Sequence, residues 1–335
     1  MKKILMLAIV ITTTTATAQT IRRVNNNFGV SGVNVYATPQ AAHDAAAAND
    51  ILIIEPSSTS YGNFTIAKPL KIYGNGYFLS TNTELKADQR NSTVGTLTLD
   101  AGSEGTEVYG LTTGACTIQG ASNISIARCQ NAYISIYNYS TASVYANVTG
   151  IILKNNYIPS GIGLHPTSSY VIADVNISNN IVYNISASST DTQNLIVINN
   201  TIFGGTSNNI TNAVVENNLF YNGGTVTANN TTLSYNVSSG TTFGGGIGNQ
   251  DNVTITTEVQ GSGTGISDDE FYVINAASTL KTAGNGGIEV GAFGGATPYV
   301  ISGIPAIPSI LNMINSGTGD GSNPLDVTIS VKSNN

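Results

Sequence analysis

The chain has 335 residues, which is enough for one large domain or two ordinary ones. Only 9% of its residues are charged against 41% that are hydrophobic, so Asn, Thr, Ser and Gly must supply the polar surface, as is typical of strands and turns. The net charge of −7 argues against a nucleic-acid partner, because phosphate binding requires clustered Lys and Arg, and the ordinary hydrophobic content argues against disorder.

Residues 1–18 have the pattern of a secretory signal peptide. Lys2 and Lys3 precede an apolar run at 4–11 that is too short to span a bilayer, and the Ala-Thr-Ala triplet at 16–18 fits a cleavage site. No later stretch of the sequence is long and apolar enough to cross a membrane. We therefore predict an exported protein that acts outside the cell or at its surface, with the periplasm as the alternative compartment.

A lead-in at 19–34 is followed by the pattern of a short helix and several strands. Thr38 and Pro39 suit the N-cap and the first position of a helix through the alanine-rich stretch at 40–48. The stretches DILIIEP, GNFTI and KPLKIYGNG then place apolar residues between turn residues and predict strands. Because the open end of a strand stack exposes unpaired edges, we expect the helix to cover the first turn.

Five segments between residues 151 and 238 repeat one pattern around an asparagine. The anchoring asparagines lie 24, 20, 18 and 18 residues apart, at Asn156, Asn180, Asn200, Asn218 and Asn236. An apolar residue stands three positions before each anchor, and the residues two positions after it are mostly apolar again. This is strand-type alternation interrupted at one fixed place, as is typical of a solenoid with a repeat of about twenty residues.

A repeat of this length cannot bury its apolar side chains alone, so successive turns must stack. At a strand spacing of roughly 4.8 Å, equivalent residues form ladders, and the inward ladder consists of Leu153, Ile177, Val197, Val215 and Leu233. A ladder of the anchoring asparagines can satisfy the backbone at the bend, since a carboxamide both donates and accepts hydrogen bonds. Asparagine also tolerates the left-handed backbone that such a bend needs.

The C-terminal part differs from the repeats. SILNMI and LDVTISVK flank a turn-rich segment and predict a strand pair within a tail at 301–335, behind the stiff connector IPAIP. Together, the asparagine-anchored repeats, the capping helix, KPLKIYGNG and STLKTAGNGGIEVGAFGG resemble bacterial secreted proteins of the pectin-lyase-like superfamily. That resemblance implies an all-β fold: a right-handed parallel β-helix over 35–300, with 278–295 as its last turn.

The chain has two cysteines, Cys116 and Cys129. They could pair in an oxidising compartment, whereas two small buried residues explain them at least as well. Their spacing of 13 residues need not match the stacking period, so it does not decide between the two.

The resemblance also implies polysaccharide chemistry on the outward positions of one sheet. Lyases of this fold use an Arg or Lys base and often calcium, and hydrolases use converging carboxylates. Two residues before the anchors, the outward positions hold Lys154, Ser178, Ile198, Glu216 and Ser234. Lys154 and Glu216 lie three turns apart, roughly 14 Å, which is too far to act on one glycosidic bond. No Lys or Arg occurs from 155 to 280, so an anionic polymer is a poor ligand.

The remaining candidate site residues lie in the less regular turns and loops. The catalytic candidates are Arg90, Asp100, Glu107 and Arg128. The candidate ligand contacts are Lys154, Glu216, Tyr133 and Tyr137, the tyrosines because sugar faces stack on aromatic rings, although stacking within the solenoid explains them about as well. Calcium is the one cofactor considered, at Asp268 and Asp269, against the alternative of a solvated turn. We expect His165 to be an ordinary loop residue.

The leading hypothesis is a non-catalytic secreted β-helix that contacts a neutral polysaccharide or a cell-surface component. Its basis is the outward face, which lacks paired ionisable groups. The alternative is a polysaccharide lyase or glycoside hydrolase whose site lies between Lys86 and Lys154. A third hypothesis is a structural spacer whose partner binds the tail.

Overall fold

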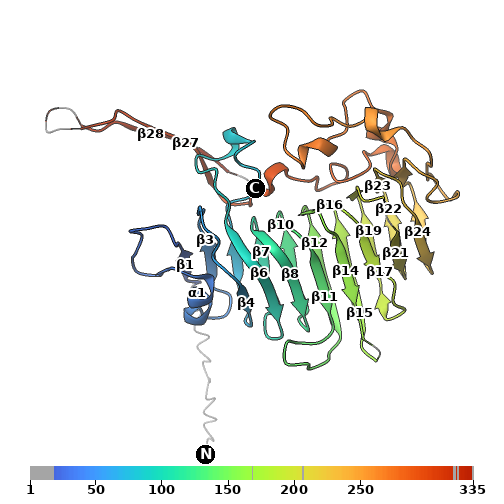
Figure 1. Ribbon diagram of the computed structural model, residues 1–335, viewed down its shortest axis with the longest axis horizontal. Helices are drawn as coiled ribbons and strands as arrows, with labels where there is room; N and C mark the ends of the chain where they lie inside the picture. Colours follow the sequence, from blue (N-terminus) through green and yellow to red (C-terminus); the bar gives the residue numbers. More distant parts are fainter. Residues whose placement is uncertain (1–18, 168, 206, 320–321, 323, 334–335) are drawn as a thin grey trace, which may run out of the picture.

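The computed structural model describes residues 19–333 except positions 168, 206, 320, 321 and 323 (Figure 1). The predicted signal peptide at 1–18 lies outside these residues. The described chain forms a parallel β-solenoid of about nine turns with one α-helix and a C-terminal antiparallel strand pair, which confirms the predicted all-β parallel β-helix. Within the same residues, no helix is long and apolar enough to span a membrane.

The first sheet forms one side of the solenoid and has twelve described strands. All its strand pairs are parallel, and consecutive turns contribute neighbouring strands. The strands follow the order β2 (Val35–Tyr36), β1 (Ile21–Val24), β3 (Ile51–Ile54), β5 (Lys71–Tyr73), β7 (Glu107–Tyr109), β9 (Ser125–Ala127), β12 (Val148–Lys154), β15 (Ile172–Ser178), β19 (Leu195–Ile198), β22 (Ala213–Glu216) and β25 (Thr232–Ser234), with β18 (Thr192–Gln193) paired to β15.

The second sheet has fourteen described strands and covers the rest of the solenoid. Its order is β24 (Val226–Asn229), β21 (Asn208–Thr211), β17 (Ile185–Ala187), β14 (Ile162–His165), β11 (Ile134–Tyr137), β8 (Thr112–Gln119), β10 (Gln130–Asn131), β13 (Tyr157–Ile158), β16 (Ile181–Val182), β20 (Thr201–Ile202), β23 (Leu219–Phe220) and β26 (Val237–Ser238), and β6 (Thr93–Asp100) pairs with β8 and with β4 (Phe64–Ile66). Since β8 pairs with both β10 and β11, one long strand of the early turns is replaced by two short strands in the later turns.

An inward row of aliphatic side chains runs through the first sheet and forms much of the core. The strand register aligns Ile72, Val108, Ile126, Leu153, Ile177, Val197, Val215 and Leu233. Every member except the last is fully buried. Removing this apolar surface from water is the main stabilising contribution to such a stack, at about 25 cal/mol per Å².

A buried asparagine ladder stands at the bend between the first sheet and the second. The backbone N–H and the Nδ2 of each anchoring asparagine donate to the Oδ1 of the next one along the stack at 2.8–3.0 Å, through Asn156, Asn180, Asn200, Asn218 and Asn236. Asn236 continues the ladder to Asn249 at 2.9 and 3.1 Å, a position outside the repeat pattern. The ladder therefore satisfies buried backbone groups that the bend leaves unpaired.

The left-handed backbone falls on the residue before each ladder asparagine, not on the anchor itself. The φ angles are +53° to +58° at Asn155, Asn179, Asn199, Asn217 and Tyr235. The expectation that one asparagine both turns the chain and forms the ladder is wrong. The two roles fall on neighbouring residues because the side chain of the ladder asparagine must point into the stack, whereas the residue before it only has to adopt the left-handed backbone. Tyr235 shows that this preceding position accepts a residue other than asparagine.

Residues 284–305, here called the return strap, run back along the outside of this bend toward the N-terminal half (Figure 1). Their bonds follow the turns in reverse order. The Asn179 Nδ2 donates to the carbonyls of Ala292 and Gly294 at 2.9 and 2.8 Å, and the Asn155 Nδ2 donates to the Thr297 carbonyl at 3.2 Å. The outward asparagine of each pair thus holds the strap to the stack.

The structure corrects two expectations about where the stack begins and ends. The stretch at 278–295 is not a last turn, because it lies across several turns instead of adding one. The stack itself begins at β1, inside the expected lead-in, and its last described solenoid strand is β26. Close approach requires glycine at one point of the strap, since a Cβ on Gly303, whose φ is +55°, would lie 2.3 Å from the Tyr77 ring.

The helix α1 (Pro39–Ala45) covers the N-terminal end of the solenoid, as predicted. The Thr38 hydroxyl oxygen accepts a hydrogen bond from the Ala41 N–H at 3.2 Å, and the helix packs against β1 to β4. Short 3₁₀ turns lie in loops and in the strap region, at η1 (Thr83–Leu85), η2 (Ile255–Thr257), η3 (Glu270–Tyr272), η4 (Thr279–Thr282), η5 (Asn285–Gly287) and η6 (Ile301–Gly303).

The predicted tail strands form the antiparallel pair β27 (Ser309–Asn315) and β28 (Val327–Lys332), which projects from the body (Figure 1).

The two cysteines are buried core residues. Cys116 and Cys129 are fully buried and carry free thiols. Burial raises the pKa of the Cys129 thiol to about 12 and also raises the pKa of Cys116. Of the two interpretations left open by the sequence, the structure shows small buried side chains.

Candidate functional site

The outward face of the first sheet carries two straight rows of side chains. Row 1 consists of Lys71, Glu107, Ser125, Ile152, Asn176, Ile196, Val214 and Thr232. Row 2 consists of Tyr73, Tyr109, Ala127, Lys154, Ser178, Ile198, Glu216 and Ser234. Ionisable side chains are concentrated at the N-terminal end of both rows, and the later turns present a largely uncharged surface.

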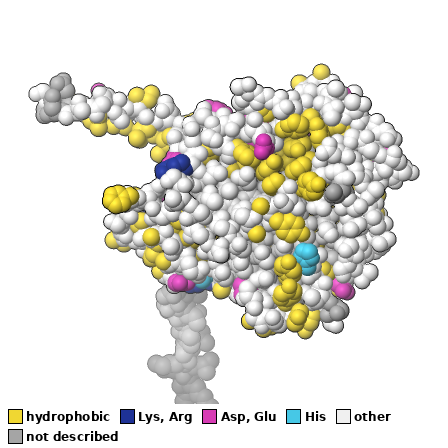
Figure 2. All heavy atoms as spheres, in the orientation of Figure 1, with side chains coloured by type: hydrophobic (Ala, Val, Ile, Leu, Met, Phe, Trp, Pro, Cys, Tyr) yellow, Lys and Arg dark blue, Asp and Glu magenta, His cyan; other side chains and the backbone are white. Residues whose placement is uncertain are grey.

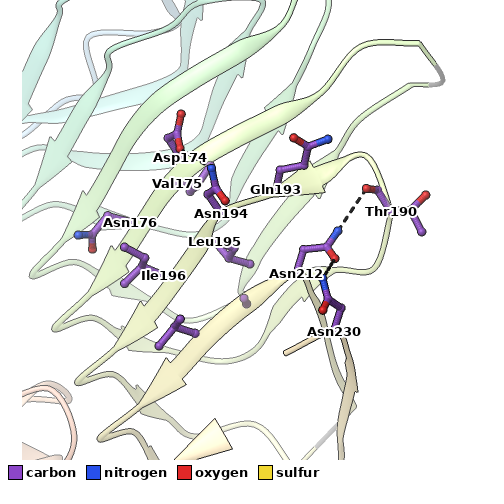
Figure 3. Close-up of a pocket in the computed structure, with 12 residues that line it drawn as sticks. Asp174, Val175, Asn176, Thr190, Gln193, Asn194, Leu195, Ile196, Asn212 and Asn230 are labelled. Atoms are coloured by element: carbon purple, nitrogen blue, oxygen red, sulfur yellow. Dashed lines mark hydrogen bonds between the residues drawn. The ribbon is translucent and has the colours of Figure 1, made fainter. Parts of the chain in front are cut away.

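A groove of about 790 Å³ lies on this uncharged part, near the start of β19, β22 and β25 (Figure 3). Ile196 and Val214 of row 1 form its apolar part and are 39% and 44% exposed. The polar lining comes mostly from side-chain amides, at Asn176, Gln193, Asn194, Asn212 and Asn230. The groove therefore combines accessible aliphatic surface with groups that both donate and accept hydrogen bonds.

Four residues with left-handed backbone form the rim of the groove, one inside β15 and three just before β19, β22 and β25. They are Asp174, Asn194, Asn212 and Asn230, with φ between +48° and +54°. Their side chains bond in two pairs: the Asn230 Nδ2 donates to the Asn212 Oδ1 at 2.9 Å (Figure 3), and the Asn194 Nδ2 donates to the Asp174 Oδ1 at 3.0 Å. Between the pairs, the Asn212 Nδ2 donates to the carbonyl of Thr192 at 2.7 Å. The rim is thus a second, exposed asparagine row.

Two carboxamides in the groove keep unpaired groups for a ligand. Within the described chain, the side chains of Asn176 and Gln193 form no hydrogen bond, but the Asn176 Oδ1 is buried, so the Asn176 Nδ2 and the Gln193 amide are the groups that a ligand can reach. Asp174 is the one ionisable residue that lines the groove in the part of the chain described, and its Oδ1 already accepts from Asn194. The groove is therefore suited to an uncharged ligand with several hydroxyl groups.

The rim row was missed by sequence reasoning, although the sequence contains a signal for it. Asp174, Asn194, Asn212 and Asn230 stand six residues before the anchors and repeat with steps of 20, 18 and 18. These are the same steps as those of the buried ladder. Comparing every position of the repeat, not only those next to the anchor, would have identified it.

Lys154 and Glu216 do not form one site. Both lie in row 2 and are separated by three strand steps, through Ser178 and Ile198. The Glu216 carboxylate accepts hydrogen bonds from the Ser234 Oγ at 3.0 Å and from the Asn285 Nδ2 at 3.2 Å. Glu216 is therefore held by the next turn and by the return strap.

Tyr137 belongs to an aromatic cluster on the second sheet and its adjoining loops. Its ring stacks on His165 at 4.9 Å between centroids, and Tyr145 stacks on Tyr170 at 5.9 Å. Tyr139 lies between the two pairs, at 5.2 Å from Tyr137 and 5.6 Å from Tyr145. Figure 2 shows hydrophobic side chains gathered in a band across one face of the molecule, where charged side chains are few. Because these rings stack on one another, they offer fewer free faces to a sugar.

Tyr133 joins the same cluster at Gly163. A Cβ at Gly163 would lie 2.2 Å from the Tyr133 hydroxyl oxygen and 2.5 Å from the His165 Nε2, so both polar atoms lie over this glycine. Burial raises the pKa of Tyr133 and lowers the pKa of His165. The expectation of a loop position for His165 is wrong, since it is the last residue of β14.

Two of the four catalytic candidates lie far from any shared site. Arg90 bonds to Asp88 through its Nε at 3.0 Å and its Nη2 at 2.7 Å. Asp100 ends β6 and accepts hydrogen bonds from the backbone N–H of Thr141 at 2.9 Å and from the Thr141 hydroxyl. Both residues therefore hold local loop structure.

The other two candidates, Glu107 and Arg128, lie at the middle strands of the first sheet, in the two turns before that of Lys154. Glu107 forms an ion pair with Lys71 at 3.4 Å and accepts from the Tyr109 hydroxyl at 2.9 Å. Burial, together with this carboxylate, raises the pKa of Tyr109 to about 12. Arg128 and Lys154 line one cleft there, a grouping that sequence reasoning did not make.

The acidic pair considered for calcium is divided by burial. Asp268 is exposed, whereas Asp269 is fully buried and accepts hydrogen bonds from the Ser267 Oγ at 2.6 Å and the Ser302 N–H at 2.7 Å. Burial raises the pKa of Asp269. Asp269 is therefore not part of a solvent-exposed turn, and its carboxylate is not accessible as a metal ligand. The residues that the structure describes contain no group of three or more His, Cys, Asp or Glu side chains suited to a metal ion.

Comparison with known proteins adds no family to this description. No protein family and no curated protein matches the chain. The interpretation of the groove on the first sheet therefore depends on its own chemistry: free carboxamides, exposed aliphatic side chains and one hydrogen-bonded carboxylate.

Proposed function

We propose that this chain is a secreted, non-catalytic solenoid related to the pectin-lyase-like superfamily that binds a neutral polysaccharide outside the cell or at its surface. The observation that carries the proposal is the groove, with its free amides at Asn176 and Gln193 beside Ile196 and Val214. Sugars present hydroxyl groups and C–H faces, so they need donors, acceptors and apolar surface instead of ionic partners.

The repetition of the groove also favours a polymer. Equivalent groups recur in successive turns at about 4.8 Å, so a chain of similar units can meet similar contacts along the stack. Export is supported by the signal-peptide pattern at 1–18.

Direct binding measurements test the proposal. Soluble neutral polysaccharides (a β-glucan, a xylan and a mannan) are titrated against the wild type and against Val214→Asp, which places a carboxylate in the apolar part of the groove. We expect at least one polysaccharide to bind and Val214→Asp to weaken it about tenfold or more, because the introduced charge must be desolvated. The matched control is Val144→Asp, at a residue that is 64% exposed and does not line the groove. Equal binding by both variants, or no binding to any polysaccharide, would contradict the proposal.

A polysaccharide lyase or glycoside hydrolase is the second candidate, favoured by Glu107, Arg128 and Lys154 in the middle turns of the same face. Against it, Glu107 is already paired with Lys71, and the part of the cleft formed by described residues is lined by no carboxylate. Release of reducing ends or unsaturated products that stops in Glu107→Gln and Arg128→Asn would favour the enzyme.

A further inference from the structure

A second concave surface, separate from the groove, lies between the first sheet and the return strap. This cleft of about 620 Å³ is lined on one side by β5, β7, β9 and β12, and on the other by strap residues that include Thr297, Pro298 and Val300. Arg128 and Lys154 are its two charged residues within the described chain. The rings of Tyr73 and Tyr109, stacked at 5.4 Å, complete it.

Arg128 occupies a position that most other turns give to asparagine or glycine, with Tyr235 as the other exception. Its φ is +55°, and the equivalent residues at the neighbouring bends are Gly110 and Asn155. A long side chain in this left-handed conformation is strained, and such residues are enriched where function requires the side chain. The Arg128 N–H donates to the Lys154 carbonyl at 3.1 Å, which places the two cations in adjacent turns.

The two positive charges of the cleft have no counter-charge from the described chain. The Arg128 side chain donates to one acceptor, the Ile304 carbonyl, at 2.9 Å. The Lys154 ammonium makes no ion pair and no hydrogen bond with any described residue, and Glu107 on the same face is taken by Lys71 at 3.4 Å. Five other described cations have a carboxylate partner, at Arg22, Arg23, Lys71, Arg90 and Lys281, whereas Lys68, Lys86 and Lys332 form no ion pair with a described residue.

Partial burial makes this lack of a partner costly. Burial lowers the pKa of Arg128, and burial together with the charge of Arg128 lowers the pKa of Lys154. The chain has a net charge of −7, so it has more carboxylates than cations, yet none of the described carboxylates pairs with these two adjacent cations. Both cations can therefore pair with an anion from outside the chain.

We propose that Arg128 and Lys154 bind a doubly charged tetrahedral oxyanion in this cleft, either a phosphate monoester on a larger ligand or free phosphate or sulfate. A dianion balances both cations, whereas a monocarboxylate leaves one charge uncompensated. A guanidinium and an ammonium together offer donors to several oxygens of one tetrahedral group. The site does not depend on polysaccharide binding in the groove.

Ligand-induced stabilisation and calorimetry at constant ionic strength test the proposal. Inorganic phosphate, inorganic sulfate and a sugar phosphate monoester are titrated against the full chain, with acetate as the monoanion for comparison. We expect saturable binding and a rise in the unfolding midpoint with the dianions, and a much smaller effect with acetate. Tighter binding of the monoester than of free phosphate identifies a phosphorylated ligand, and the reverse identifies the free ion.

The matched variants are Arg128→Asn, Lys154→Gln and Lys332→Gln. Arg128→Asn restores the residue found at neighbouring bends, so it is expected to fold, and Lys332→Gln removes an exposed cation of the tail with the same change in net charge. The first two should weaken phosphate binding about tenfold or more, and the third should not change it. Phosphate binding that is absent in the wild type, or equal in all three variants, overturns the proposal; unfolding midpoints without anion verify that each variant is folded.

Discussion

Replacing Asn200 with alanine removes one step of the buried asparagine ladder. The Asn200 Nδ2 donates to the carbonyl of Ile177 at 2.8 Å and to the Oδ1 of Asn218 at 3.0 Å. Its Oδ1 accepts from the backbone N–H and the Nδ2 of Asn180 at 2.9 and 3.0 Å. Since Asn200 is fully buried, water cannot replace these bonds without opening the stack.

The expected loss in the free energy of unfolding is large. Each buried polar group left without a partner costs about 1–3 kcal/mol, and Asn200→Ala leaves at least two such groups, on Asn180 and at Ile177. Two such groups sum to about 2–6 kcal/mol, a substantial part of the roughly 5–15 kcal/mol that stabilises a typical domain. The control Asn222→Ala removes an exposed side chain with one bond to the Phe203 carbonyl, and should cost about 1 kcal/mol or less.

Urea unfolding followed by far-ultraviolet circular dichroism measures both variants, because the chain has no tryptophan for fluorescence. Unfolding midpoints and slopes give the free energies. If Asn200→Ala and Asn222→Ala lose the same small amount, the ladder does not stabilise the stack and the reasoning is refuted.

Three further predictions concern the strap, a buried lysine and the tail. Asn217→Ala should lower the free energy of unfolding by about 1–3 kcal/mol in urea, because it adds strain at φ +58° and removes the bond from the Asn285 N–H, and Asn217→Gly should cost less. Burial lowers the pKa of Lys86 from 10.5 to about 8, so the folded state disfavours the protonated ammonium. Lys86→Met should therefore be more stable than the wild type by about 1–3 kcal/mol at pH 6, and this difference should shrink as the pH rises from 8 to 10.5, because the wild-type lysine then loses its proton. Unfolding of both proteins at pH 6 and at pH 10.5 measures the change. Deleting 312–335 should shift the thermal midpoint by only about 2 °C, because most apolar side chains of the hairpin are exposed already, and a shift of 10 °C in calorimetry would show that the hairpin packs on the body.

The inward core ladder could be predicted because equivalent positions of a repeat must stack. Leu153, Ile177 and Val197 recur at one place in the pattern, and one register then fixes them all. The return strap could not be predicted in this way. It has no period, and its contacts join residues far apart in the chain, such as Asn155 and Thr297, which are 142 positions apart.

The candidate site was only partly predictable for the same reason. The separation of Lys154 from Glu216 follows from the repeat, since both lie in one row. The pairing of Arg128 with Lys154 depends on an irregular turn and on a strap that encloses the cleft. Neither feature has a local pattern, so only the three-dimensional structure shows it.

The central claim is that the groove on the first sheet binds a neutral polysaccharide without cleaving it. One titration of the wild type and of Val214→Asp against neutral polysaccharides, with reducing ends and unsaturated products measured in the same samples, tests it most directly. The account predicts saturable binding to the wild type, binding about tenfold weaker or more to Val214→Asp, and no products. Product release by the wild type, or equal binding by the two proteins, would contradict it.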